Sequence, residues 1–294
     1  MINRKPVFAG SFYEASFAKL EKQIKGCFYD KFGPGDLPAG RSRKRAFCII
    51  CPHAAYKYSG QCAAWAHKEI AEAECPELFI VVGPNHSGIG PGFATFLFSD
   101  WETPFGTAGV DKDSGQELMK QFKKLENNWS VHQDEHSIEV QLPFLQLVNM
   151  DKLNEIKFLP IAVGGLDFKS CKELGHAIAG LEKDFVLIVS SDFTHYGRNY
   201  GYVPFVHNKK ENLYRMDREA IEFIKNFDSE GFYNFVLKKR ATICGAAPII
   251  VGIEACKAMK AREIKRCRLL QYYASGDITG DFENCVGYGA LVFS

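Results

Sequence analysis

Short runs of β-branched and other apolar residues alternate along this chain with segments in which apolar residues recur at helical spacing. The short runs predict strands at 46–51, 78–82, 93–98, 156–163, 185–190, 267–274 and 285–293. The helical spacing predicts helices at 15–31, near 60–74, from Asp111 or Asp113 to about 125, and at 138–148, 168–181, 207–225, 229–238 and 246–259. Ser137 is expected to be the N-cap of the helix at 138–148.

Strands and helices alternate over most of the chain, which predicts an α/β fold of one domain spanning residues 1–294. We expect a central mixed β-sheet with helices on both faces. The runs at 267–274 and 285–293 follow one another without a predicted helix, so part of the sheet is expected to be antiparallel. The pattern leaves open whether the last run is central or at an edge, where it could pair with another chain.

Three predicted strands end in polar loops that carry histidines. His53 follows the run at 46–51, His86 follows 78–82, and Asp192 and His195 follow 185–190. Ligand crevices of α/β sheets open at the carboxyl ends of strands, so the three imidazoles are expected to share one pocket, with a metal as its ligand. In the last loop Asp192 could orient His195 for acid–base work, or it could simply cap the turn.

A third ligand beside His53 and His86 stays open on the residues alone. Cys244 begins a predicted helix, where the helix dipole favours a thiolate, although most free cysteines are buried apolar residues. Asp192 and Glu135 are the carboxylate alternatives. Two histidines with a carboxylate suit non-haem iron, whereas two histidines with a cysteine suit copper or zinc.

Further polar residues flank these loops. Glu135 and His136, with Glu139 one turn later, form a dense polar cluster before an apolar helix. Such a cluster can line a pocket or can cap the helix, and both readings stay open. Asn85, which precedes His86, and Tyr56, which follows His53, are also expected to lie at the pocket.

The balance of charge and the use of cysteine limit the function classes. The net charge is +1, which argues against a nucleic-acid-binding surface. The one basic stretch, Arg41–Arg45, is interpreted as a solvated loop, with a targeting or anion-binding patch as the alternative. No apolar run approaches the roughly 20 residues of a membrane span, and the N-terminus lacks a signal-peptide core. The ten scattered cysteines are typical of free thiols in a reducing compartment, so a cytoplasmic protein is expected. Cys48 and Cys51 fall within one strand and point to opposite faces, which excludes a redox dithiol.

Five segments together resemble the Memo family, mediators of receptor-tyrosine-kinase-driven cell motility with archaeal and bacterial relatives. They are Cys51-Pro-His-Ala-Ala-Tyr-Lys-Tyr-Ser-Gly60, Gly83-Pro-Asn-His-Ser87, Asp134-Glu-His-Ser-Ile-Glu-Val-Gln-Leu-Pro-Phe144, Ser190-Ser-Asp-Phe-Thr-His-Tyr-Gly197 and Thr242-Ile-Cys-Gly245. The opening Ala9-Gly-Ser-Phe-Tyr13 also matches the family's start. The resemblance implies a fold like that of the class III extradiol dioxygenases. It also implies a pocket formed by His53, His86 and Cys244, with Asp192 and His195 beside them.

This resemblance suggests three functions. The leading one is copper- or iron-dependent redox chemistry in a signalling and cell-motility role, with zinc as a further option for the metal. The second is an adaptor that binds a phosphotyrosine peptide or a signalling protein; Ala246, where relatives carry arginine, removes an anion-binding group and disfavours it. The third is a metal-dependent dioxygenase or hydrolase acting on a small molecule, with Asp192 or Glu135 as ligand. Cys244 in place of the glutamate of ring-cleaving enzymes disfavours ring cleavage.

Overall fold

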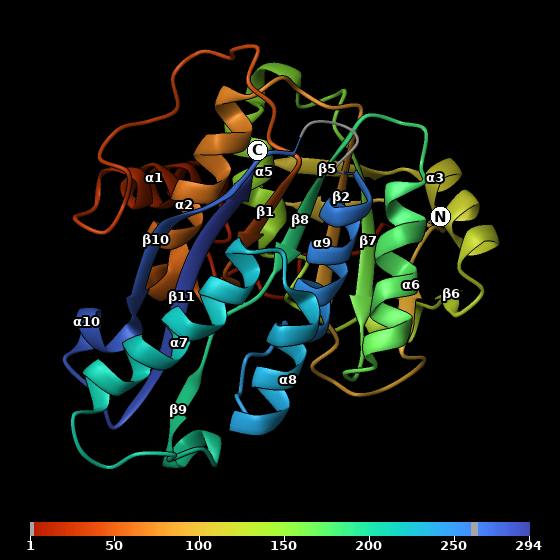
Figure 1. Cartoon of the computed structure of the whole chain (residues 1–294). Helices are drawn as coiled ribbons and strands as arrows, with labels where there is room; N and C mark the ends of the chain where they lie inside the picture. The colour runs from red at the N-terminus through yellow and green to blue at the C-terminus, as the bar shows by residue number, and fades with distance from the viewer. Residues whose placement is uncertain (1–2, 260–263) are drawn as a thin grey trace.

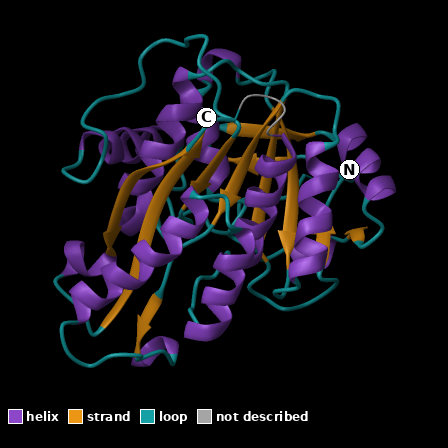
Figure 2. Cartoon of the chain, viewed as in Figure 1, coloured by secondary structure: helices purple, strands orange, loops and turns teal. Residues whose placement is uncertain are grey.

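Four parallel strands form the centre of a mixed sheet in the computed structural model, which describes residues 3–259 and 264–294 (Figures 1 and 2). The strand order is β10-β11-β1-β8-β2-β7-β3-β6. The central strands are β1 (Cys48–Cys51), β8 (Phe185–Ser190), β2 (Leu78–Pro84) and β7 (Lys157–Val163). On one side β11 (Asn284–Phe293) runs antiparallel to both β1 and β10 (Cys267–Ala274). On the other side are β3 (Phe93–Thr95) and β6 (Leu125–Asn127). The short strands β4 (Trp101–Thr103), β5 (Gly106–Val110) and β9 (His195–Gly197) pair at the margins.

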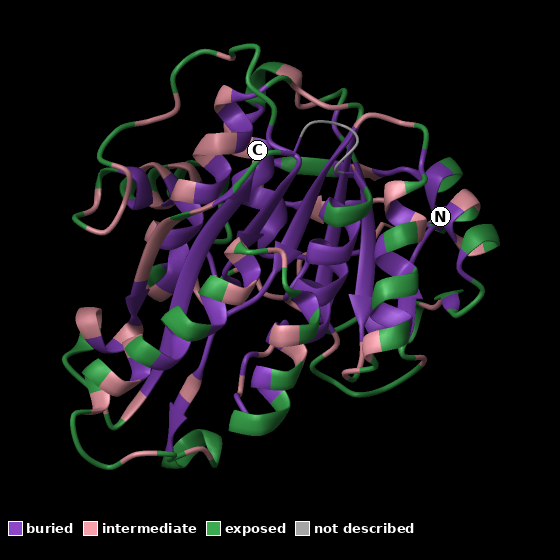
Figure 3. Cartoon of the chain, viewed as in Figure 1, coloured by how far each residue is buried: buried purple, intermediate pink, exposed green. Residues whose placement is uncertain are grey.

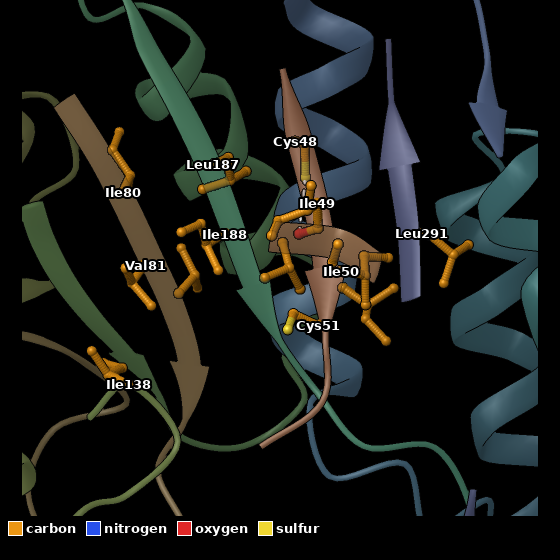
Figure 4. Close-up of a cluster of buried hydrophobic side chains, with 14 of the residues drawn as sticks. Cys48, Ile49, Ile50, Cys51, Ile80, Val81, Ile138, Leu187, Ile188 and Leu291 are labelled. Carbon is orange, nitrogen blue, oxygen red and sulfur yellow. Dashed lines mark hydrogen bonds between the residues drawn. The ribbon is translucent and has the colours of Figure 1, made fainter. Parts of the chain in front are cut away.

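The central strands read as unbroken apolar runs because both of their faces are covered. Every residue of β1, β2 and β8 is buried. Ile49 pairs with Ile188 on one face of the sheet, and Ile80 pairs with Leu187 on the other, so apolar side chains of the three strands fill both faces (Figure 4). Burial of this apolar surface is the main stabilising term of the fold.

Helices cover both faces of the sheet, and the exposed residues lie on their outer sides (Figure 3). One face carries α6 (Phe168–Ala179), α7 (Lys209–Lys225), α8 (Ser229–Lys239) and α9 (Ala246–Ala258), and the other carries α1 (Phe17–Tyr29), α2 (Tyr56–Glu72) and α5 (Gln141–Val148). The remaining helices are α3 (Lys112–Gln121), α4 (Trp129–His132) and α10 (Ser275–Thr279). The predicted α/β fold with a mixed, doubly covered sheet is confirmed.

The two cysteines of β1 show the two faces directly. A Cβ built at Gly252 of α9 would lie 3.7 Å from Cys48 Sγ, whereas Cys51 Sγ lies 3.7 Å from His67 Nδ1 of α2. The two sulfurs therefore point to opposite faces of the sheet, as predicted. All the cysteines are free thiols, and no helix among the described residues is long and apolar enough to cross a membrane.

The predicted cap at Ser137 is wrong. Helix α5 begins at Gln141 with Val140 in the N-cap position, and Ser137 lies in the preceding turn. Its hydroxyl donates 2.8 Å to the carbonyl of Pro84, the last residue of β2. Ser137 thus fastens its loop to the end of the sheet, and a Cβ at Gly83 would lie only 2.5 Å from its Oγ.

Several element boundaries also differ from the predictions. Helix α2 begins at Tyr56, one turn earlier than predicted, and the strand predicted at 93–98 ends at Thr95. The short helix α10 lies between β10 and β11, where the sequence suggested none, although these strands are antiparallel as expected. Strand β11 lies inside the sheet between β10 and β1, so it is not an edge.

Candidate functional site

Three neighbouring strands, β1, β8 and β2, deliver the predicted loops to one edge of the sheet. Cys51 pairs with Ser190, and Val82 pairs with Val189, so the strands end at nearly the same level and point the same way (Figure 4). The rings of His53 and His86 consequently meet, with centroids 5.2 Å apart. His53 is buried, whereas the His86 side chain is 35% exposed and opens the cluster to solvent.

Hydrogen bonds fix the protonation of His53. The Ser190 hydroxyl donates its one hydrogen to the carbonyl of Ser137 at 2.6 Å and accepts from Gln141 Nε2 at 2.9 Å. His53 Nδ1 also lies 2.9 Å from this oxygen. Because the hydroxyl hydrogen is already used, the oxygen can only accept from His53. Nδ1 therefore carries the hydrogen and Nε2 keeps its lone pair. Burial lowers the pKa of His53 well below its ordinary value, and the nearby His136 lowers it further, so the imidazole is neutral.

His86 is fixed in the same way by Glu135. The Glu135 carboxylate accepts from the backbone N–H of His86 at 2.6 Å and from its Nδ1 at 2.9 Å. Burial alone would raise the pKa of Glu135, but the hydrogen bonds from His86 and Ser137 outweigh it and lower the pKa to about 2. The carboxylate is thus ionised, Nδ1 of His86 donates to it, and Nε2 is free.

His136 completes a cluster of three imidazoles. Its ring stacks on His86 with centroids 4.6 Å apart and an interplanar angle of 11°, and it lies 5.4 Å from the ring of His53. Burial, followed by the charge of His86, lowers the pKa of His136 to about 4, so this ring is also neutral near pH 7. His53, His86 and His136 can each offer a ligand atom within 4.8 Å of the others. Of the two interpretations of the cluster around Glu135, a helix cap is not seen, because Glu135 holds His86 and α5 begins only at Gln141.

A second potential ligand group shares His53. Cys244 Sγ lies 3.1 Å from His53 Nε2, and Asp192 completes the group within the same 4.8 Å limit. An isolated bridge between Thr194 and Ile243 brings the Cys244 loop beside the end of β8. Burial raises the pKa of both Cys244 and Asp192, so without a cation the thiol keeps its proton. Among the described residues, no potential ligand group with atoms within 4.8 Å of one another contains both His86 and Cys244. His53 belongs to both the three-histidine group and the group with Asp192 and Cys244.

Of the two roles left open for Asp192, the orientation of His195 is not seen, because no hydrogen bond joins these two side chains. Asp192 Oδ1 accepts 2.8 Å from the backbone N–H of His53, and this carboxylate therefore shapes the His53 loop. His195 Nδ1 instead lies 3.1 Å from the carbonyls of Phe193 and Thr242. Because carbonyls only accept, Nδ1 of His195 also carries the hydrogen and leaves Nε2 free. The β9 pairing with β11 places this residue at the rim, beside the ring of Tyr200.

Asn85 and Tyr56 support the pocket and do not line it with free polar groups. Asn85 Oδ1 accepts from the backbone and hydroxyl of Ser87, and its Nδ2 donates 2.8 Å to the carbonyl of Ile89, which closes the loop around His86. The Tyr56 hydroxyl is buried and donates 2.6 Å to the carbonyl of Val140. Both side chains are satisfied internally.

Sequence reasoning missed a buried ion pair beneath the cluster. Arg4 Nη1 lies 2.6 Å from Glu139 Oε2, and both side chains are almost fully buried. Glu139 also accepts from Tyr13 and from the backbone of Val7 and Phe8, so the N-terminal segment is fastened to the turn after His136. The family-like Ala9–Tyr13 segment was the available hint, but nothing in the sequence pointed to Arg4.

Sequence comparison agrees with these motifs. The profile of the family described as Memo-like protein matches residues 4–292. The chain belongs to the Memo family. It is similar to a MEMO1 family protein of Nitrosopumilus maritimus, with 38% identity over 292 residues, and to one of Methanopyrus kandleri, with 36% identity over 297 residues. Each alignment covers 99% of this chain and 99% of the relative.

A third Memo relative, from Ignicoccus hospitalis, is 35% identical over 299 residues, covering 100% of this chain and 99% of its own length. The resemblance drawn from the five motifs is thereby confirmed for the whole chain. The structure shows that the five motif segments converge at one end of the sheet, where each contributes a residue to the two candidate ligand groups.

Proposed function

We propose that this Memo-family protein binds a redox-active metal ion, copper or iron, and that His53, His86 and Cys244 are the ligands. The observation that carries the proposal is the common state of the imidazoles. His53 and His86 each donate Nδ1–H to an acceptor supplied by the protein, Ser190 Oγ and the Glu135 carboxylate respectively. This pattern presents the Nε2 lone pair and is typical of histidines that bind metals.

The donor atoms fit such an ion. The His53 imidazole is shared by the group that contains His86 and the group that contains Cys244, and loss of the thiol proton on metal binding would give a soft ligand suited to copper and acceptable to iron or zinc. Backbone N–H of Asp192 donates 3.2 Å to Cys244 Sγ and would stabilise the thiolate. A bound copper or iron ion would supply one-electron exchange.

The surrounding residues have complementary roles in the proposal. His136 is neutral and stacks on His86 at the side of the cluster. It is proposed as an alternative ligand, because its ring nitrogen lies within 4.8 Å of those of His53 and His86. His195 keeps a free Nε2 at the rim and is proposed to carry protons to and from a substrate. Phe8 and Phe12 pack on the His136 ring, at 5.2 and 4.7 Å between centroids, and exclude water from that side.

The test is metal content measured by mass spectrometry on protein purified without chelators or an affinity tag. Wild type is compared with His53→Ala and Cys244→Ser, and with the matched controls His207→Ala and Cys75→Ser, which lie outside the cluster. Near-stoichiometric copper or iron in wild type and controls, and its loss in both site variants, is expected. Circular dichroism confirms that each variant is folded.

Two further variants identify the ligand set. Loss of metal in His136→Ala with retention in Cys244→Ser would assign the three-imidazole group, and loss in Asp192→Asn would add a carboxylate. Absence of metal in wild type, even after reconstitution with Fe(II), Cu(I) and Zn(II), would overturn the proposal. A peptide- or protein-binding adaptor role would then become the leading function.

A further inference from the structure

A cavity of 680 Å³ lies at the opposite edge of the sheet from the histidines, and half of the residues that line it are basic. It is found near the end marked C in Figure 1, where β1 and β10 begin. The basic residues come from the loop before β1 and from the start of β10: Arg43, Lys44, Arg45, Lys265, Arg266 and Arg268. Only the first three belong to the basic stretch that the sequence makes visible.

Sheet topology brings these two distant segments together. Strand β11 pairs antiparallel with both β1 and β10, so those two strands run in the same direction and start at the same edge. The backbone N–H groups of Lys265 and Arg266 donate to the carbonyl of Ser294 at 2.9 and 3.1 Å, and that of Phe47 donates to the carbonyl of Phe293 at 2.9 Å. The backbone beneath the basic side chains is therefore fixed by the sheet.

Most of this positive charge is not neutralised within the described part of the chain. Arg45 pairs with Asp184, and Arg268 pairs with Glu69. Four basic side chains, of Arg43, Lys44, Lys265 and Arg266, have no acidic partner among residues 3–259 and 264–294.

Glu72, the other acidic residue of the wall, does not neutralise them. It accepts from the backbone of Ala39 at 3.0 Å and lies 3.8 Å from Lys68. In a chain whose net charge is only +1, four cations around one hollow that lack an acidic partner among the described residues repel one another and make the local potential positive.

We propose that this basic cavity binds a small ligand that carries two or more phosphate groups. Arginine side chains form bidentate hydrogen bonds with phosphate, and lysines add point charges. The cavity is concave and of limited volume, which suits a compact oligophosphate; a nucleic acid would need an extended basic stripe, and the balanced composition provides none. The site is remote from the histidine cluster, so the proposal does not depend on metal binding.

The experiment is isothermal titration calorimetry with inorganic tripolyphosphate on chelator-treated full-length protein, without divalent cations. Wild type is compared with Arg43→Ala/Arg266→Ala and with Lys44→Ala/Lys265→Ala. The matched control, Lys19→Ala/Lys22→Ala on exposed positions of α1, removes the same charge elsewhere. Binding by wild type and control, weakened about tenfold or more in both cavity variants and reduced by added salt, is expected.

A second arm distinguishes the sources of the phosphate. Sedimentation with phosphatidylcholine vesicles, with and without phosphatidylinositol bisphosphate, shows whether a lipid headgroup occupies the cavity; headgroup-dependent binding that the cavity variants lose would identify the membrane source. Tripolyphosphate binding without vesicle binding would identify a soluble ligand. Absence of tripolyphosphate binding, or equal dissociation constants in all four proteins, would overturn the proposal.

Discussion

Ser190→Ala is expected to damage both the stability of the protein and the state of His53, because the Ser190 hydroxyl is the centre of three buried hydrogen bonds. It donates to the carbonyl of Ser137 and accepts from Gln141 Nε2 and His53 Nδ1. Gln141 Nε2 keeps a second partner, the carbonyl of Pro52 at 2.9 Å. The variant therefore leaves three buried groups without this partner: the Ser137 carbonyl, the Nδ1–H of His53 and one N–H of the Gln141 amide.

Each unsatisfied buried group costs about 1–3 kcal/mol, so with three such groups the free energy of unfolding should fall by at least about 3 kcal/mol. Loss of an outer-shell partner of a metal-binding histidine typically lowers metal affinity by about 10–100-fold. We expect both effects, because without Ser190 nothing selects the tautomer that presents the Nε2 lone pair of His53.

Three measurements test this reasoning. Urea unfolding gives the change in stability, competition with a chelator gives the metal affinity, and ¹⁵N NMR of the metal-free protein reports which nitrogen of His53 is protonated. The control is Ser229→Ala, which removes another buried hydroxyl, bound to Glu254 on the far helices, and should lower stability without altering His53.

The tautomer decides the outcome. A wild-type protein with hydrogen on Nε2 of His53 would refute the assignment of Ser190 as acceptor. An unchanged tautomer and metal affinity in Ser190→Ala, together with reduced stability, would reduce Ser190 to a structural residue.

Two other predictions concern the folded chain as a whole. Burial raises the pKa of Asp217 from 3.8 to about 6, so the folded state holds a proton that the unfolded state loses. The free energy of unfolding should therefore fall by up to about 3 kcal/mol as the pH rises from about 4 to 6. Melting experiments at several pH values should show that Asp217→Asn flattens this decline. A Cβ at Gly175 of α6 would lie 2.7 Å from the carbonyl of Val251 in α9, so Gly175→Ala should destabilise the protein by about 1–3 kcal/mol. A Cβ at Gly26 of α1 would have nothing within 4 Å, so Gly26→Ala should stabilise the protein by about 0.5–1 kcal/mol. Equal melting temperatures for these two variants would contradict the packing argument.

The location of the histidine loops could be predicted from the sequence because buried parallel strands leave a strong local pattern. Apolar runs ending at Cys51, Val82 and Ser190 mark strand ends, and parallel strands share their carboxyl edge. The placement of His53 and His86 on the same edge of the sheet follows from those two facts. The neighbour order β1-β8-β2 was not predictable, but any order that kept the three strands together would bring the loops close.

The partners of each side chain could not be predicted in this way, because they depend on contacts between residues far apart in the chain. Ser137 has a side chain suited to a helix cap, yet its hydroxyl binds the end of β2, 53 positions away. Asp192 lies close to His195 in sequence, but the backbone of His53 captures its carboxylate. Likewise, Cys244 reaches His53 through contacts between its loop and the loop after β8, among them the pairing of Ile243 with Thr194.

The position of β11 has a consequence for how this chain folds. Among the last residues of the sequence, it lies between β10 and β1, a strand formed more than 200 residues earlier. Closing so long a loop is entropically slow, so the sheet is expected to complete late, after local helices have formed. Until then β1 offers an unpaired edge of buried apolar residues, Cys48–Cys51, that invites aggregation. During synthesis β1 is therefore expected to stay prone to aggregation until β11 has been made and has paired with it.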